Sequence, residues 1–184
     1  MIYNQDCMEA MKEMSDNQFD LAIVDPPYGY GDKKTDILNF RQKEQHREWN
    51  IAPNEVYFKE LFRVSKNQII WGGNYFPFIW AFGGRCFIYW HKGNPVPNFA
   101  DGELAWTSFD KNAKQYDYRY YGNLEGNSSA TKKFHPTQKP ISLYEWLLMN
   151  YAKEGDTILD THLGSGSIAI ACHNLGFELT GYEI

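Results

Sequence analysis

The sequence predicts an α/β fold built on a mainly parallel, doubly wound sheet. Three observations lead to this prediction. Short apolar runs alternate with amphipathic helical segments along most of the 184 residues. Hydrophobic residues make up 43% of the chain and charged residues 22%, which is enough apolar surface for a packed core. The length suits one domain of ordinary size, so we expect a single domain over residues 1–184.

In the first half of the chain, apolar runs predict strands and one amphipathic stretch predicts a helix. Residues 19–24 form a short apolar run that Pro26 and Pro27 stop, which is typical of a buried strand. The polar stretch 29–50 has no clear periodicity and is typical of a functional loop. Residues 53–64 carry apolar side chains at helical spacing, with proline near the first turn. Further strands are expected at residues 68–71, 85–90 and 103–108.

The second half has clearer boundaries. Ser142 and Glu145 have the spacing of a capping box, which predicts a helix running to about Lys153. Gly155-Asp156 ends that helix, and a strand is expected at 157–160. A Gly/Ser turn then leads into a helix at about 165–175 and a last strand at 178–183.

The charge balance permits a nucleic-acid partner without requiring one. The net charge is −5, from 18 basic and 23 acidic residues. Steering depends on where charges cluster, however, and residues 111–139 carry six basic side chains against two acidic ones. No apolar run approaches the ~20 residues of a membrane span, and Met1 is not followed by a signal-peptide pattern. We therefore expect a cytoplasmic protein with no membrane association.

The cysteines and histidines give little support to a metal site. The three cysteines are far apart and form no C-x-x-C pair, and the five histidines are scattered. An odd cysteine count also argues against a secreted disulfide framework. We expect no metal ion.

A strand–turn–helix segment near the end of the chain suits a nucleoside ligand. Its sequence is Asp160-Thr-His-Leu-Gly-Ser-Gly-Ser167, in which glycines let the backbone approach a ligand and the next helix offers free N–H groups. Glu183 follows Asp160 by 23 residues, at the end of the next strand, where an acid can accept hydrogen bonds from ribose hydroxyls. The glycines are not spaced as G-x-G-x-x-G, which disfavours a nicotinamide dehydrogenase. An ordinary tight turn is the structural alternative.

The tetrapeptide Asp25-Pro26-Pro27-Tyr28 suits an exocyclic amine. It lies at the carboxyl end of the first strong strand, where open α/β sheets bind ligands. Prolines lack N–H groups and leave their carbonyls free, so with Asp25 they form a site made of acceptors alone. Tyr28 adds a flat face for the ring that carries the amine. The alternative is a Pro-Pro end to a strand followed by a surface tyrosine.

Together these segments resemble the amino-methyltransferases of nucleic acids, which use S-adenosylmethionine. Asp25–Tyr28 is similar to their catalytic tetrapeptide, and Asp160–Ser167 is similar to their cofactor loop. His135-Pro-Thr-Gln-Lys-Pro140 resembles the segment before the cofactor loop in permuted members, and Asn4–Cys7 resembles the stretch before the tetrapeptide. The catalytic motif comes early and the cofactor loop late, as in the β-group DNA methyltransferases. The resemblance implies a Rossmann-like methyltransferase fold with this permuted motif order.

The resemblance also implies roles for individual residues. Asp25, Pro26, Pro27 and Tyr28 would be catalytic, and Glu183 would take the ribose hydroxyls of the cofactor. Lys139 would pair with the methionine carboxylate, unless it is only a surface charge. The implied cofactor-binding residues are Asp6, Cys7, Asp25, His135, Thr137, Lys139, Asp160, His162, Gly164, Ser165, Gly166, Ser167 and Glu183.

The implied activity is transfer of a methyl group from S-adenosylmethionine to N6 of a flipped adenine in DNA, as in restriction–modification systems. Asp rather than Ser before Pro-Pro favours adenine over cytosine in the related family. No cysteine adjoins the tetrapeptide, which argues against the covalent route of ring-carbon methylation. The alternatives are an N4-cytosine DNA methyltransferase, an N6-adenine RNA methyltransferase, and a non-catalytic nucleic-acid-binding subunit.

Three departures from the family pattern stand out. Thr161-His162 replaces Pro-Phe in the cofactor loop, so His162 either takes the place of the phenylalanine or caps the turn. The target-recognition region has to lie within 91–134, which is short; recognition is then loose or needs a second subunit, such as another copy of the chain. The sequence also stops just after Glu183, where relatives continue into another helix. A truncated product with one uncovered sheet face is therefore a further alternative.

Overall fold

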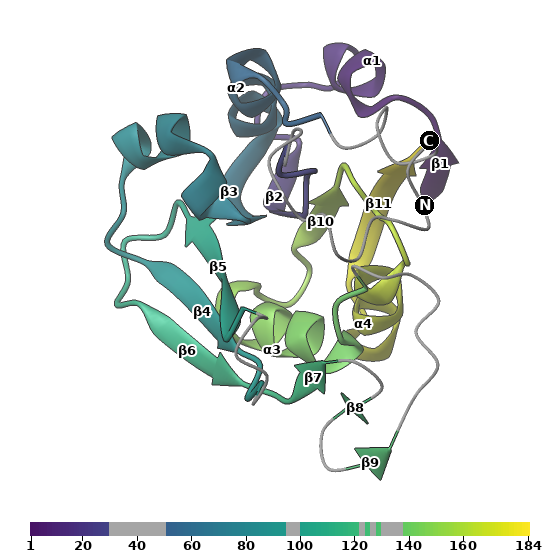
Figure 1. Cartoon of the computed structure of the whole chain (residues 1–184). Coiled ribbons are helices and arrows are strands. Elements are labelled where there is room, and N and C mark those ends of the chain that lie inside the picture. The colour runs from purple at the N-terminus through teal and green to yellow at the C-terminus, as the bar shows by residue number, and fades with distance from the viewer. Residues whose placement is uncertain (30–50, 95–99, 122–123, 126–127, 130–137) are drawn as a thin grey trace, which may run out of the picture.

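One eight-stranded sheet forms the centre of the fold (Figure 1). The computed structural model describes residues 1–29, 51–94, 100–121, 124–125, 128–129 and 138–184. The strand order is β1-β11-β10-β2-β3-β5-β4-β6, and every neighbouring pair is parallel except the two pairs that include β5. The predicted mainly parallel sheet is confirmed. Its strands are β1 (Ile2–Asn4), β2 (Phe19–Val24), β3 (Ser65–Trp71), β4 (Phe87–His91), β5 (Gly102–Thr107), β6 (Lys114–Asp117), β10 (Thr157–Asp160) and β11 (Glu178–Glu183).

Helices pack against both faces of this sheet, as a doubly wound fold requires. Alternate residues of β2 point to opposite faces. Leu21 and Ile23 join the core under α3 and α4, whereas Ala22 and Val24 join the core under α1 and α2. The described part of the chain contains four α-helices: α1 (Cys7–Lys12), α2 (Glu55–Val64), α3 (Ile141–Tyr151) and α4 (Ser167–Leu175).

Shorter elements connect or extend these layers. Two 3-10 helices, η2 (Gly73–Tyr75) and η3 (Pro77–Phe82), lie between β3 and β4. A separate three-stranded sheet consists of β7 (Tyr120–Tyr121), β8 (Leu124–Glu125) and β9 (Ser128–Ser129). The predicted recognition region 91–134 thus contains β5 and β6, which belong to the central sheet. Residues 95–99 and several positions between 122 and 134 lie outside the described part of the chain.

The predicted capping box at Ser142 is wrong. Helix α3 begins at Ile141, its N-cap is Pro140, and no side chain caps it. The Ser142 hydroxyl instead accepts a 3.1 Å hydrogen bond from Tyr116, because the helix begins two residues earlier than the capping box predicts, with Pro140 as its N-cap. Helix α2 does have a side-chain cap: Asn54 accepts hydrogen bonds from the N–H groups of Val56 and Tyr57 at 3.0 and 3.3 Å.

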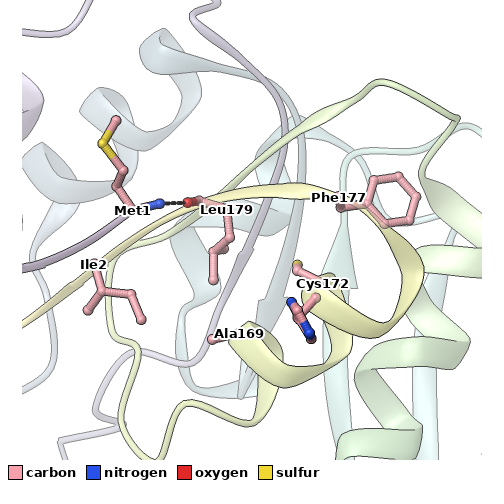
Figure 2. Close-up of a pocket in the computed structure, with 7 residues that line it drawn as sticks. Met1, Ile2, Ala169, Cys172, Phe177 and Leu179 are labelled. Atoms are coloured by element: carbon pink, nitrogen blue, oxygen red, sulfur yellow. Dashed lines mark hydrogen bonds between the residues drawn. The ribbon is translucent and has the colours of Figure 1, made fainter.

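A shallow hollow among the described residues lies away from the predicted site. Figure 2 shows it beside the beginning of β11 and helix α4, with a volume of about 350 Å³. Its lining is mainly apolar and consists of Met1, Ile2, Ala169, Cys172, His173, Phe177 and Leu179. Asp160 and Glu183 lie at the opposite, carboxyl ends of their strands. None of the described helices is both long and apolar enough to cross a membrane.

Candidate active site

The carboxyl ends of β2 and β10 bring the two predicted motifs to one edge of the sheet. The strands are parallel neighbours, with Leu21 opposite Ile158 and Ala22 opposite Leu159. Asp160 ends β10, and Asp25 directly follows β2. The two carboxyl groups are close enough that Asp25 contributes to raising the pKa of Asp160. The structure therefore brings the tetrapeptide and the glycine turn together, although they are far apart in the sequence.

The tetrapeptide presents a carboxylate and an aromatic ring that are fixed to each other. The Tyr28 hydroxyl donates a 2.7 Å hydrogen bond to Asp25 Oδ1. The Tyr28 ring stacks on Tyr75, with centroids 5.0 Å apart. Gly72 makes room for it, because a Cβ at that position would lie 2.1 Å from Tyr28 Cε1. Gly72 also has a φ of +67°, which favours glycine.

Lys139 contacts Asp25 from inside the protein. Its side chain is only 4% exposed, and its ammonium forms ion pairs with Asp25 Oδ2 and, at 3.2 Å, with Glu103 Oε2. Lys92 pairs with the other oxygen of Glu103. Burial tends to lower the pKa of Lys139, but the carboxylates of Asp25 and Glu103 raise it above its ordinary value. Lys139 is therefore charged and is not a surface residue; its predicted contact with a methionine carboxylate stays a prediction.

The glycine turn after β10 forms an open cradle. The Gly164 N–H donates a 2.7 Å hydrogen bond to Glu183 Oε2, and the Ser165 and Ser167 hydroxyls are 3.1 Å apart. Gly164 and Gly166 have φ values of +54° and +74°, and a Cβ added at Gly166 would meet nothing within 4 Å. Helix α4 starts at the next residue without a side-chain cap, so its first N–H groups face this space.

Asp160 is a buried carboxylic acid whose ionised form a nearby positive charge would stabilise. Burial raises the pKa of its carboxyl to about 8, and the Asp25 and Glu183 carboxylates add to the rise, against the lowering effect of the hydrogen bond from the His162 N–H. That bond joins His162 N to Asp160 Oδ1 at 3.0 Å. A ligand with a positive charge beside this carboxyl would stabilise its ionised form.

A residue of helix α2 contacts the Thr161-His162 pair, which replaces Pro-Phe of the family pattern. Tyr57, buried in α2, has its hydroxyl 2.6 Å from Thr161 Oγ1 and 3.4 Å from His162 Nδ1. The Tyr57 and His162 rings meet edge to face at 5.3 Å. Burial lowers the pKa of His162 to about 4, so this ring is neutral and packs as an aromatic side chain.

The segment after β1 lies next to Glu183. Asn4 is opposite Glu183 in the β1–β11 pair, and Gln5 donates its N–H to the Glu183 carbonyl at 3.1 Å. Asp6 caps helix α1 through Oδ1, which accepts from the N–H groups of Met8 and Glu9 at 2.7 and 3.1 Å. Burial and Asp6 raise the pKa of Cys7 to about 11. Asp6 and Cys7 are thus near the predicted ribose acid, while His135 and Thr137 lie outside the described residues.

Two residues that shape this site, Tyr57 and Glu103, were not predicted from the sequence. Glu103 gave a usable signal, since it is the one charged side chain in strand 102–107. Tyr57 gave none, because an aromatic residue on the apolar face of a helix is ordinary core.

The fold and the convergent motifs define a Rossmann-like methyltransferase architecture. The profile of the N6_N4_Mtase family, described as DNA methylase, matches residues 79–184, and the chain belongs to this family. The type II methyltransferase M.HpaI of Haemophilus parainfluenzae is 27% identical over 220 residues, which cover 96% of this chain and 68% of that protein.

Two solved structures have the same fold. The complex of M1.HpyAVI with S-adenosylmethionine (SAM) superposes with a TM-score of 0.64 at 24% identity, covering 100% of this chain and 92% of that chain. The PvuII DNA methyltransferase, described as cytosine-N4-specific, gives a TM-score of 0.63 at 14% identity, covering 100% and 81%. These likenesses confirm the predicted methyltransferase fold.

Proposed function

We propose that this DNA methylase is an adenine N6-methyltransferase that uses S-adenosylmethionine. The observation that carries the proposal is the convergence of Asp25, at the end of β2, with the glycine turn and Asp160 of the neighbouring strand. Membership of the DNA methylase family gives the reaction class. The choice of adenine rather than cytosine as the acceptor goes beyond family membership. It rests on the resemblance of Asp25-Pro-Pro-Tyr28 to the adenine form of the tetrapeptide.

The cradle between β10, α4 and β11 fits the cofactor. S-adenosylmethionine supplies a methyl group on a positively charged sulfur, which makes that methyl open to attack by a nitrogen lone pair. In this proposal Glu183 accepts hydrogen bonds from the ribose, and Asp160 offers a buried carboxyl to a positively charged group. The free N–H groups at the start of α4 and the backbone from Gly164 to Ser167 suit the carboxylate end.

The other half of the site suits an aromatic amine. The lone pair of an aromatic amine is delocalised into the ring, so its nitrogen is a weak nucleophile. Acceptance of both amino hydrogens, by Asp25 and the Pro26 carbonyl, would favour a tetrahedral nitrogen and free the lone pair. Positioning and electrostatics supply the rest of the acceleration. A base inside a duplex cannot reach this pocket, so it has to be flipped out and stacked, with Tyr28 as the platform.

DNA contacts would come from the region around residues 91–134 and the basic excess between 111 and 139. A short recognition region favours loose recognition or a second subunit, and a homodimer is one form that this would take. Because bacterial DNA lies in the cytoplasm, the proposed activity implies a cytoplasmic enzyme.

N4 of cytosine is the second candidate acceptor, because the family includes both chemistries and an acceptor-only site also suits that amine. Adenine in RNA and a non-catalytic role are the remaining alternatives. The test is to incubate the protein with labelled cofactor and either DNA or RNA, digest the product, and identify the labelled nucleoside. N6-methyladenine from DNA supports the proposal, and label only in N4-methylcytosine or in RNA contradicts it.

The Asp25→Ala variant separates an enzyme from a binding subunit. Transfer should fall to background while cofactor binding, measured by calorimetry, persists. Asp16→Ala, which removes an exposed carboxylate paired with Arg63, is the matched control and should transfer methyl groups like the wild type. Equal activity of Asp25→Ala and wild type would refute the assigned role.

A further inference from the structure

A chain of four alternating charges begins at the proposed acceptor site and passes through the buried Lys139. Asp25 pairs with Lys139, Lys139 pairs with Glu103, and Glu103 pairs with Lys92. The members come from three separate parts of the chain: the segment after β2, the segment before α3, and the ends of β4 and β5. Charged side chains so well covered are costly unless each has a partner. The arrangement therefore needs an explanation beyond chance surface pairing.

We propose that Lys139 and Glu103 are positioning residues for Asp25. In this proposal Lys139 orients the Asp25 carboxylate, and Glu103 holds Lys139 in place and shares its positive charge with Asp25. The inference rests on the proposed function, because it assigns Asp25 the role of holding the target amine.

The contacts fix the position of the Lys139 ammonium. Besides its two carboxylates, it lies 5.3 Å from the Trp71 ring centroid and 5.9 Å from the Tyr28 ring centroid. Trp71 is fully buried and Lys139 nearly so, which leaves little room for another rotamer. Asp25 is more open than Lys139, at 20% side-chain exposure, so a substrate could reach the Asp25 end of the charge chain.

The two Asp25 oxygens are held separately. Tyr28 donates to Oδ1 at 2.7 Å, and Lys139 donates to Oδ2. Each oxygen of a carboxylate can accept about two hydrogen bonds, so the amine can still donate to Asp25 while both protein donors stay bound. Tyrosine and lysine thus set the plane of the carboxylate without using up its acceptors.

Glu103 matters when the charge on Asp25 changes. As the amine nitrogen becomes methylated it loses one proton, and the N–H electron pair stays on nitrogen. Asp25 takes this proton and becomes neutral. Lys139 then keeps Glu103 as its counter-charge at 3.2 Å, so no unpaired ammonium is left buried. Although burial raises the pKa of Glu103, Lys139 and Lys92 lower it to about 2, which keeps Glu103 ionised.

Several other ionisable groups surround Asp25 and stay unchanged in the variants below. In the described part of the chain they are Tyr28 of the tetrapeptide, Tyr57 of α2, Tyr144 of α3 and Asp160 of β10. The comparison with the wild type isolates the effects of Lys139 and Glu103.

The two positioning residues predict pH shifts of opposite sign. Loss of the Lys139 charge removes a cation from Asp25, so the acid limb of the kcat profile should move up by about one pH unit in Lys139→Met. Without the Glu103 charge, the positive charge of Lys139 acts on Asp25 alone. The acid limb should therefore move down in Glu103→Gln. We expect kcat to fall about 100-fold in Lys139→Met and about 10-fold in Glu103→Gln. Glu103→Asp, which keeps the charge, should return the limb toward its wild-type position.

Titration of the Asp25 carboxyl by ¹³C NMR tests the same signs without any turnover, with Asp25→Asn to assign the signal. Lys66→Met is the control, because it removes a lysine paired with Asp20 at the other end of the same strands. Unchanged Asp25 titration in both variants, or shifts of the same sign, would overturn the proposal. If Lys139→Met does not fold, the sign in Glu103→Gln decides.

Cofactor binding distinguishes the proposal from the rival role of Lys139. Calorimetry should give Lys139→Met a Kd for S-adenosylmethionine within about three-fold of wild type. A loss of ten-fold or more, with Asp25 titrating normally, would assign Lys139 to the cofactor carboxylate and overturn the inference. Absence of methyl transfer by the wild type would instead refute the proposed function, while the NMR titration still decides the inference.

Discussion

Gly164 and Glu183 are joined by a 2.7 Å hydrogen bond from the backbone N–H of the glycine to Oε2 of the acid. The bond links the turn after β10 to the end of β11, two positions that a nucleoside would bridge. It also leaves the other Glu183 oxygen available at the exposed rim of the site.

Glu183→Gln should weaken S-adenosylmethionine binding. The change removes a charged acceptor from the ribose, and hydrogen bonds to charged groups contribute about 1.5–3 kcal/mol, so we expect a Kd at least about ten-fold higher by calorimetry. Glu178→Gln, at the exposed beginning of the same strand, is the control and should bind like wild type. Equal affinity of Glu183→Gln and wild type would contradict the ribose role.

Asp160 makes the stability of the cofactor-free protein depend on pH. Its pKa is about 8 in the folded state, above the ~3.9 of an unfolded aspartate, so the native state binds more protons between these values. Its contribution is therefore present below about pH 4 and is lost as pH rises toward 8. The free energy of unfolding should fall over this window by up to about 1.4 kcal/mol per pH unit. Asp160→Asn should flatten this slope in urea titrations, whereas the surface variant Asp101→Asn should keep it.

His162 should be replaceable by phenylalanine. The neutral ring packs edge to face on Tyr57, a contact that phenylalanine can keep. Thr161 would retain its 2.6 Å bond to Tyr57, so we expect His162→Phe to change the free energy of unfolding by less than about 1 kcal/mol. His162→Ala should cost about 1 kcal/mol more through the lost aromatic pair. A large loss of cofactor affinity in His162→Phe would show that the imidazole itself contacts the ligand.

Gly72→Ala should disable methyl transfer while sparing cofactor binding. A Cβ at Gly72 would overlap the Tyr28 ring, 2.1 Å from Cε1, and push it out of its stack. Gly176→Ala is a matched control, because its φ of +77° carries the same backbone strain but its Cβ would meet nothing within 4 Å. Backbone strain alone should cost each variant about 1 kcal/mol of stability, and only Gly72→Ala should lose activity. Equal activity of the two would contradict the placement of Tyr28 at the base.

The sheet and the two motifs were predictable because local patterns set them. The apolar run at 19–24 and the Gly/Ser turn before α4 mark a strand end and a helix start in the sequence itself. β1 and α1 gave weaker signals, since all three residues of β1 are exposed and α1 spans six residues. The error at Ser142 arose because Pro140 starts the helix without a side-chain cap.

The charge chain behind Asp25 could not be predicted in the same way. Lys139 and Glu103 are 36 positions apart in the sequence, and neither lies near Asp25 along the chain. Their pairing depends on β5 running antiparallel beside β3 and on the entry into α3, which only tertiary packing determines. The residue types show that these positions carry charges, but only the fold shows which charges pair with each other.

The central claim is that the cofactor cradle and the acceptor site face each other, and a crystal structure of the protein bound to S-adenosylmethionine tests it most directly. We expect the ribose at Glu183 and the methyl group directed toward Asp25 and the Pro26 carbonyl. A cofactor bound elsewhere, or one whose methyl group points away from Asp25 with no room for a base between them, would contradict it.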